Sequence, residues 1–128
     1  MRNDKENLIV SLTLQFALDI VVFTEKLEER KKFVVARQIL KSGTSIGANV
    51  REAQNAESKA DFIHKLKIAA KEADETGYWL EICRHSQNYC FDPELTEQLI
   101  SITKVLSKII GSSKRRQSPN QHINESSN

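Results

Sequence analysis

Residues 42–54 read SGTSIGANVREAQ, and this stretch decides the fold. Two glycines and several small polar residues stand here between flanks with a helical pattern. Gly43 to Gly47 also spell G-x-S-x-G, the elbow that carries the nucleophilic serine of many hydrolases. The stretch is therefore either a catalytic loop or a helix that lets another backbone come close.

The apolar periodicity runs through both glycines without a break. It steps by three and four residues over Ala36, Ile39, Gly43, Ile46, Val50 and Ala53. A loop has no reason to keep this helical phase. The preceding RKKFVVARQILK also lacks the strand that a hydrolase elbow requires. We therefore predict one helix over about residues 32–56. The alternative is that Gly43 ends one helix and Thr44 or Ser45 caps the next.

Gly43 and Gly47 share one face of the predicted helix, where a neighbouring helix could approach closely. Each glycine costs about 1 kcal/mol of helix propensity relative to alanine, so a close contact is expected to compensate. A polar stripe runs beside them, predicted to hydrogen-bond a neighbouring helix or subunit: Ser42, Ser45, Asn49 and Glu52. The candidate packing residues are Gly43, Ser45, Ile46, Gly47, Asn49 and Glu52.

Four segments show helical periodicity: 4–29, 32–56, 58–87 and 92–111. Their seven-residue seams and short connections predict an all-α fold, an antiparallel up-and-down four-helix bundle with left-handed packing. Pro93 suits the first position of the fourth helix, and Gly111 is expected to end it. The bundle would then span residues 1–111, followed by a disordered polar tail over 112–128.

Charge is balanced within the predicted bundle. Residues 1–111 hold 16 Lys and Arg and 16 Asp and Glu, and the tail supplies the formal net charge of +2. This balance argues against a chain built mainly to neutralise phosphates. We find no signal peptide and no 18-residue apolar run, so the sequence predicts a cytoplasmic protein that does not enter a membrane.

No set of residues predicts catalysis, a metal site or a cofactor. Cys83, His85 and Cys90 are too few and too irregularly spaced for a structural zinc site. Two cysteines without a secretion signal are expected to stay reduced. No acid–base pair or activated nucleophile stands out, so the sequence does not predict an enzyme.

Basic residues form small groups that could contact phosphates. The candidate nucleic-acid-binding residues are Arg37, Lys41, Arg51, Lys67, Lys71, Lys114, Arg115 and Arg116. The alternative is a solvated face with local ion pairs, such as Lys71 with Glu75. In an oligomer each group would be repeated, and weak contacts would add.

The stretch from Ser45 to Ile82 resembles the small four-helix bundle proteins first noticed in intervening sequences of bacterial 23S ribosomal RNA genes. The matching elements are Ser45-Ile46, Asn49-Val50, Glu52, Asp61-Phe62-Ile63 and Glu81. Commoner members carry glycine where this chain has Ala53. The resemblance implies a ring, often a homopentamer, without enzymatic activity. A relative, the accessory protein of diversity-generating retroelements, is more basic and binds nucleic acid and a reverse transcriptase.

Two functional hypotheses follow. The first is a non-catalytic, ring-forming scaffold, pentameric by resemblance, that presents a repeated surface to a protein or RNA partner. The second is an RNA- or DNA-binding accessory protein that uses repeated basic patches.

Overall fold

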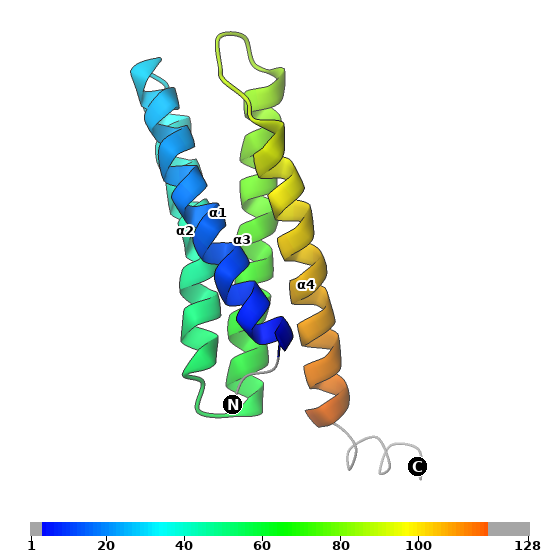
Figure 1. Ribbon diagram of the computed structural model, residues 1–128. Coiled ribbons are helices and arrows are strands. Elements are labelled where there is room, and N and C mark those ends of the chain that lie inside the picture. Colours follow the sequence, from blue (N-terminus) through cyan, green and yellow to red (C-terminus); the bar gives the residue numbers. More distant parts are fainter. Residues whose placement is uncertain (1–3, 118–128) are drawn as a thin grey trace, which may run out of the picture.

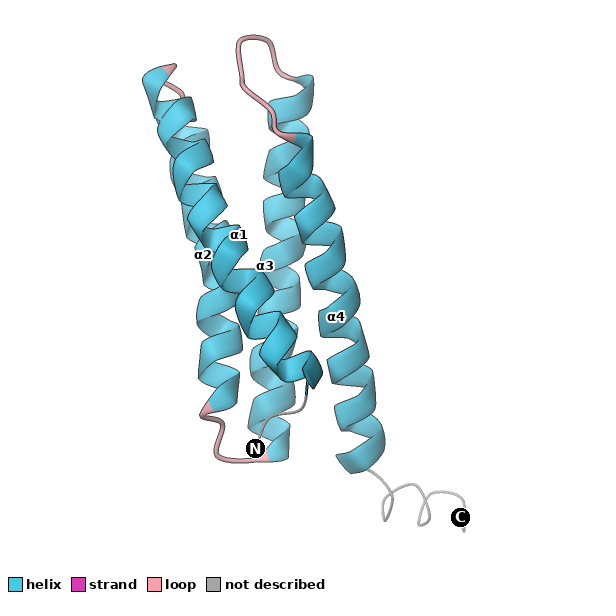
Figure 2. Ribbon diagram, viewed as in Figure 1, coloured by secondary structure: helices cyan, strands magenta, loops and turns pink. Residues whose placement is uncertain are grey.

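The computed structural model describes residues 4–117, which form four antiparallel helices (Figure 1). They are α1 (Asp4–Glu29), α2 (Phe33–Gln54), α3 (Lys59–His85) and α4 (Pro93–Gln117). Short loops join them, and the described part of the chain has no strand (Figure 2). The predicted all-α, up-and-down bundle is confirmed.

Each helix packs against its neighbours in the chain, and α1 also packs against α4. The order around the bundle is therefore α1, α2, α3, α4. The outer face shared by α1 and α2 consequently lies on the opposite side of the bundle from the outer face shared by α3 and α4 (Figure 1).

Side-chain caps explain where two of the helices begin. The hydroxyl of Ser58 accepts a hydrogen bond of 3.0 Å from the amide of Asp61 at the start of α3. At the start of α4, the carboxylate of Asp92 accepts one of 3.0 Å from the amide of Glu94. Each contact satisfies an amide of the first turn that has no partner inside its helix.

The core is formed by the predicted apolar stripes. Its largest fully buried side chains are Phe16, Ile9, Ile20, Leu27, Ile39, Ile46, Leu66, Leu80, Leu95, Ile102, Leu106 and Val50. Burying one side chain of this size contributes about 1.5–3 kcal/mol, so packing rather than helix propensity holds the bundle together.

The expected end of the fourth helix is wrong. Gly111 has no positive φ, and α4 continues through it to Gln117. Ser113 is fully buried, so this extra length packs against the bundle. The basic residues Lys114, Arg115 and Arg116 occupy the last turn, where positive charge favours a helix. Residues 112–117 are thus not a disordered tail, and residues 118–128 lie outside the described residues.

The sequence was expected to hold no 18-residue apolar run, but α1 is long and apolar enough to cross a membrane by length and composition alone. An 18-residue window of this helix reaches a mean hydropathy of 1.8, which suffices by length and composition. Polar residues such as Thr13 and Gln15 interrupt the apolar run, but the mean hydropathy of the window stays high despite them. A third of the window, 33%, is buried inside the bundle. Of the other apolar side chains of α1, Val10 and Leu12 pack partly buried against the core, whereas five are exposed: Leu8, Leu14, Leu18, Val21 and Val22.

Candidate functional site

Gly43 and Gly47 lie inside the unbroken helix α2, against α1. A Cβ atom added at Gly43 would lie 3.0 Å from two branch carbons of Ile20. One added at Gly47 would lie 3.3 Å from the backbone oxygen of Thr13. These distances are shorter than ordinary van der Waals contact, so α1 occupies the space that larger side chains would need.

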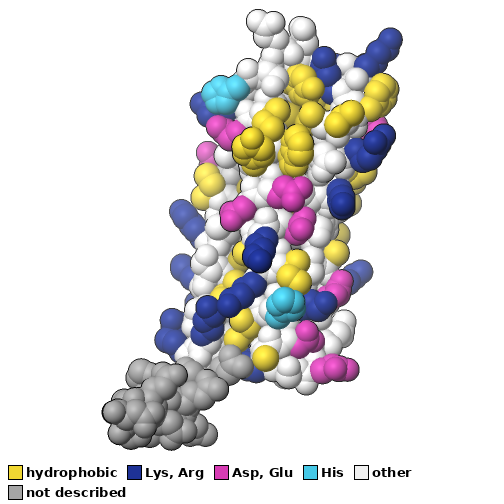
Figure 3. Space-filling view, turned by 180° about the vertical axis from the view of Figure 1, so that it is seen from behind, with side chains coloured by type: hydrophobic (Ala, Val, Ile, Leu, Met, Phe, Trp, Pro, Cys, Tyr) yellow, Lys and Arg dark blue, Asp and Glu magenta, His cyan; other side chains and the backbone are white. Residues whose placement is uncertain are grey.

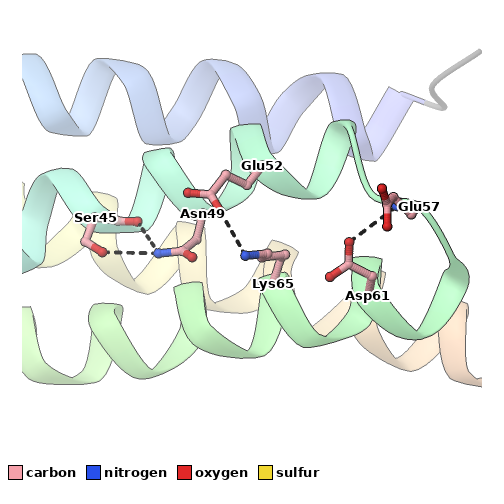
Figure 4. A network of polar contacts seen from close by, with 6 residues as sticks. All are labelled: Ser45, Asn49, Glu52, Glu57, Asp61 and Lys65. Carbon is pink, nitrogen blue, oxygen red and sulfur yellow. Dashed lines mark hydrogen bonds and ion pairs between the residues drawn. The ribbon is translucent and has the colours of Figure 1, made fainter.

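Ser45 is part of α2 and does not stand on a strand-to-helix elbow. Its hydroxyl accepts a hydrogen bond of 3.1 Å from the side-chain amide of Asn49, which also lies 2.9 Å from the backbone oxygen of Ser45 (Figure 4). The G-x-S-x-G pattern therefore lacks the local structure that exposes a nucleophile in hydrolases.

The polar stripe of α2 meets α3 at two places. The hydroxyls of Ser42 and Thr76 lie 2.9 Å apart in the interior. Nearer the α2–α3 loop, the ammonium of Lys65 donates to the carboxylate of Glu52 over 2.9 Å (Figure 4). The predicted contact with a neighbouring helix thus holds for Ser42 and Glu52. Ser45 and Asn49 bond to each other within α2.

An apolar groove follows the outer face between α1 and α2. It is defined here as the α1/α2 groove, has a volume of about 170 Å³ and is lined by Val10, Thr13, Leu14, Ala17, Thr44, Gly47, Ala48, Val50 and Arg51. The groove is open at this point because Gly47 has no side chain and the side chain of Ala48 is short. Leu14 in its lining is 59% exposed, and Leu18, one helical turn further along α1, is 54% exposed.

A second apolar groove follows the outer face between α3 and α4. This α3/α4 groove is lined by Ala73, Asp74, Gly77, Thr96, Leu99, Ile100, Thr103 and Lys104. Its floor lies at Gly77, which has no side chain, and Ile100 stands beside it 49% exposed. Neither groove was predicted from the sequence, although Leu14, Leu18 and Ile100 lie off the buried stripes of their helices.

The predicted basic residues fall into separate places. Arg37 and Lys41 are exposed on α2, whereas Arg51 lines the α1/α2 groove. Lys67 of α3 instead lies beside Lys114 of α4. A hydrogen bond from the Lys114 ammonium to the neutral amine of Lys67, together with the charge of Lys114, lowers the pKa of Lys67 from its ordinary value, and the charge of Lys71 adds to this effect. The sequence analysis did not bring Lys114 and Lys67 together, because they are far apart in the chain.

The two cysteines are free thiols. Cys83 lies in the last turn of α3, and Cys90 lies in the loop between α3 and α4. Burial raises the pKa of the Cys83 thiol to about 11, and the nearby Cys90 adds to this shift. Cys83 therefore stays protonated near neutral pH and serves as a core residue. Within residues 4–117, no three His, Cys, Asp or Glu side chains are grouped as metal ligands.

Comparison with known proteins identifies the family. The family model described as 23S rRNA-intervening sequence protein matches residues 5–112. The chain belongs to this family. Its structure is similar to the crystal structure of a protein of unknown function from the S23 ribosomal protein family of Bacteroides thetaiotaomicron, with a TM-score of 0.80 and 45% identity. The match covers 84% of this chain and 98% of that protein. No curated protein matches.

The family resemblance noted in the sequence centres on α2 and the start of α3. Three residues that match the family, Ser45, Asn49 and Glu52, lie on the side of α2 that faces α3 (Figure 4). Ile46, between them in the motif, is fully buried. Of these residues, Glu52 contacts α3 through Lys65, whereas Ser45 and Asn49 bond to each other within α2.

Proposed function

We propose that this protein is a non-catalytic scaffold that joins copies of itself head to tail into a ring. The observation that supports the proposal is the pair of apolar grooves on opposite sides of the bundle. Exposed apolar patches of this kind are typical of interaction surfaces. Two different patches on opposite sides favour contacts in which one copy's first groove meets the next copy's second groove. Such contacts close into rings or extend into filaments.

Charges at the grooves favour the same pairing. Arg51 lines the α1/α2 groove, and Asp74 lines the α3/α4 groove. Both side chains are exposed, and neither has an ion pair with a described residue of its own protomer. Pairing two α1/α2 grooves would bring like charges together, whereas pairing unlike grooves lets Arg51 meet Asp74. Complementary charge of this kind fixes which surfaces dock. Lys104 lines the same groove as Asp74 and is expected to lie at the margin of the contact.

Light scattering after size exclusion tests the assembly. The pentamer that the family resemblance implies would have five times the protomer mass of 14.6 kDa. Leu14→Glu and Ile100→Glu place a charge in one groove each and should lower the mass to that of a monomer. Val34→Glu is the matched control, because Val34 is 68% exposed and lines neither groove. A monomeric wild-type protein at tens of micromolar would end the proposal.

A charge exchange tests which grooves meet. Arg51→Glu and Asp74→Arg should each weaken assembly, since each change sets like charges against one another. The double variant should restore assembly, because the pair is then reversed rather than broken. If the double variant assembles no better than the weaker single variant, the two grooves do not face each other in this way.

A further inference from the structure

The neutral bundle has an uneven distribution of charge on its α3–α4 side. Residues 98–117 of α4 contain five Lys and Arg and no Asp or Glu, and residues 62–71 of α3 contain three Lys and no Asp or Glu. Because α3 and α4 are antiparallel neighbours, residues 62–71 near the start of α3 lie beside the last part of α4 (Figure 1). The balance of charge over the whole chain therefore conceals a basic region.

Three ammonium groups converge within this region. Lys67 and Lys71 are one turn apart on α3, and Lys114 of α4 lies close enough to lower the pKa of Lys67 by direct contact and by its charge. On α4, Lys108 and Arg115 are exposed two helical turns apart on one side. From behind, Lys and Arg side chains line the left edge and the lower middle of the molecule, and a second group lies at the upper right (Figure 3). Like charges held together in this way create a positive potential that attracts an anion.

We propose that this basic cluster, made of Lys67, Lys71, Lys108, Lys114 and Arg115, binds the phosphate backbone of a nucleic acid. The site goes beyond the scaffold role, since it shares no lining residue with the α3/α4 groove, although Lys71 and Lys108 border that groove beside Asp74 and Lys104. A ring would repeat the cluster and strengthen the binding, but one protomer suffices for a measurable contact.

The residue types favour a phosphate backbone over an acidic protein. Protein interfaces are depleted of lysine and enriched in aromatic side chains. The cluster is mostly lysine, and the one aromatic side chain of residues 62–71, Phe62, packs partly buried against the core, whereas Tyr78 and Trp79 lie toward the other end of α3. Lysine acts as a point charge that needs no fixed geometry, which suits contacts with successive phosphates.

The site differs from the set that the sequence predicted. Arg37 and Lys41 are exposed on α2, which packs beside α1 and α3 rather than beside α4. They form a separate pair and provide a matched control with the same number of charges. Arg51 belongs to the α1/α2 groove.

Fluorescence anisotropy with a labelled RNA hairpin tests the proposal. Wild-type protein should bind at about 50 mM salt, and its affinity should fall on the order of a hundredfold at about 200 mM, as expected for release of ions from four or five phosphates. The double variant Lys67→Glu/Lys71→Glu should bind at least about tenfold more weakly at the lower salt than Arg37→Glu/Lys41→Glu. Circular dichroism and light scattering should show that both variants keep the fold and the mass of the wild type.

Three results would overturn the proposal. The first is no binding at the lower salt, and the second is an equal loss of affinity in the two double variants. In the third, polyglutamate displaces the labelled hairpin as well as unlabelled hairpin does, which would assign the cluster to an acidic protein instead. Displacement by the hairpin alone supports a nucleic-acid backbone. Because both variants are also weighed by light scattering, failure of the ring and failure of the cluster are distinguishable.

Discussion

The hydroxyl groups of Ser42 and Thr76 lie 2.9 Å apart between α2 and α3, where both side chains are buried. Thr76 also lies 2.7 Å from the backbone oxygen of Glu72 in its own helix. Thr76 has a single hydroxyl hydrogen, so when it donates to Glu72, Ser42 donates to Thr76. Each hydroxyl thus satisfies the other in the interior, and together they fix how α2 lies against α3.

Removing this pair should show coupling between the two residues. We expect Thr76→Val to lower the free energy of unfolding by about 1–2 kcal/mol, because it leaves the buried Ser42 hydroxyl without its partner. Ser42→Ala should cost less, about 0.5–1.5 kcal/mol, because the Thr76 hydroxyl still donates to the backbone oxygen of Glu72. The double variant should lose less than the sum of the two, since it leaves no stranded group. Urea unfolding monitored by circular dichroism measures all three. Losses that add within about 0.3 kcal/mol would show that the hydroxyls act independently.

Substitution by alanine should have opposite effects at Gly43, which lies against α1, and at Gly111 of α4, which has space for a methyl group. At Gly43 the new methyl group meets the buried Ile20 at 3.0 Å, whereas at Gly111 the nearest atom belongs to the exposed Arg115 side chain, 3.5 Å away. Overpacking typically costs about 1–3 kcal/mol. Alanine returns about 1 kcal/mol of helix propensity at either site.

We therefore expect Gly43→Ala to lower the free energy of unfolding by up to about 2 kcal/mol and Gly111→Ala to raise it by up to about 1 kcal/mol. Thermal and urea unfolding of the two variants check the prediction. A stabilising Gly43→Ala would mean that α1 moves aside without cost, and the glycines would then need another explanation.

The sequence predicted what depends on helical phase. Gly43 and Gly47 kept the apolar period of α2, so an unbroken helix could be inferred before any contact was known. The polar stripe was found in the same way, because Ser42 and Glu52 stand beside the apolar positions of the same helix. Periodicity shows on which face of a helix a residue lies, and these predictions required no other information.

The missed features depend on long-range packing. Gly111 carries a local signal for a helix end, but the burial of Ser113 continues α4 beyond it. The proximity of Lys67 and Lys114 depends on how far α4 is shifted along α3, and periodicity contains no information on that shift. The grooves likewise depend on which two helices are neighbours, which the order of elements alone does not settle.

The two thiols should differ in reactivity. Cys83 is buried and Cys90 is half-buried, and burial raises the pKa of Cys83 to about 11. The thiolate is the reactive form, so at pH 8 a thiol reagent should modify Cys90 readily and Cys83 only after unfolding. Cys90→Ser should remove the fast phase and leave the slow one. Rapid modification of Cys83 in the folded protein would contradict its placement in the core.

The same shift predicts how stability depends on alkaline pH. The ordinary pKa of a cysteine is 9.0, and the folded value for Cys83 is about 11. Between these values the folded state binds more protons than the unfolded state, so this contribution is complete below about pH 9 and is lost as pH rises toward about 11. Cys83→Ala should flatten that part of the pH profile measured by urea unfolding, even though the cavity lowers stability at every pH. An unchanged slope would show that Cys83 does not titrate in this range.

The crowding of positive charge at Lys67 should cost stability. The pKa of Lys67 lies below its ordinary 10.5, first because of Lys114 and then because of burial and Lys71. The unfolded state therefore binds more protons just below pH 10.5, and stability from this group rises with pH there.

At neutral pH and low salt, Lys67→Gln should raise the melting temperature, and the gain should shrink as salt screens the repulsion. Lys41→Gln, which removes an exposed lysine of α2, is the control and should change the melting temperature less. A gain at Lys67 together with weaker RNA binding would indicate that the lysines are kept close for a ligand at the expense of stability, whereas equal melting temperatures for both variants would show that the repulsion is negligible.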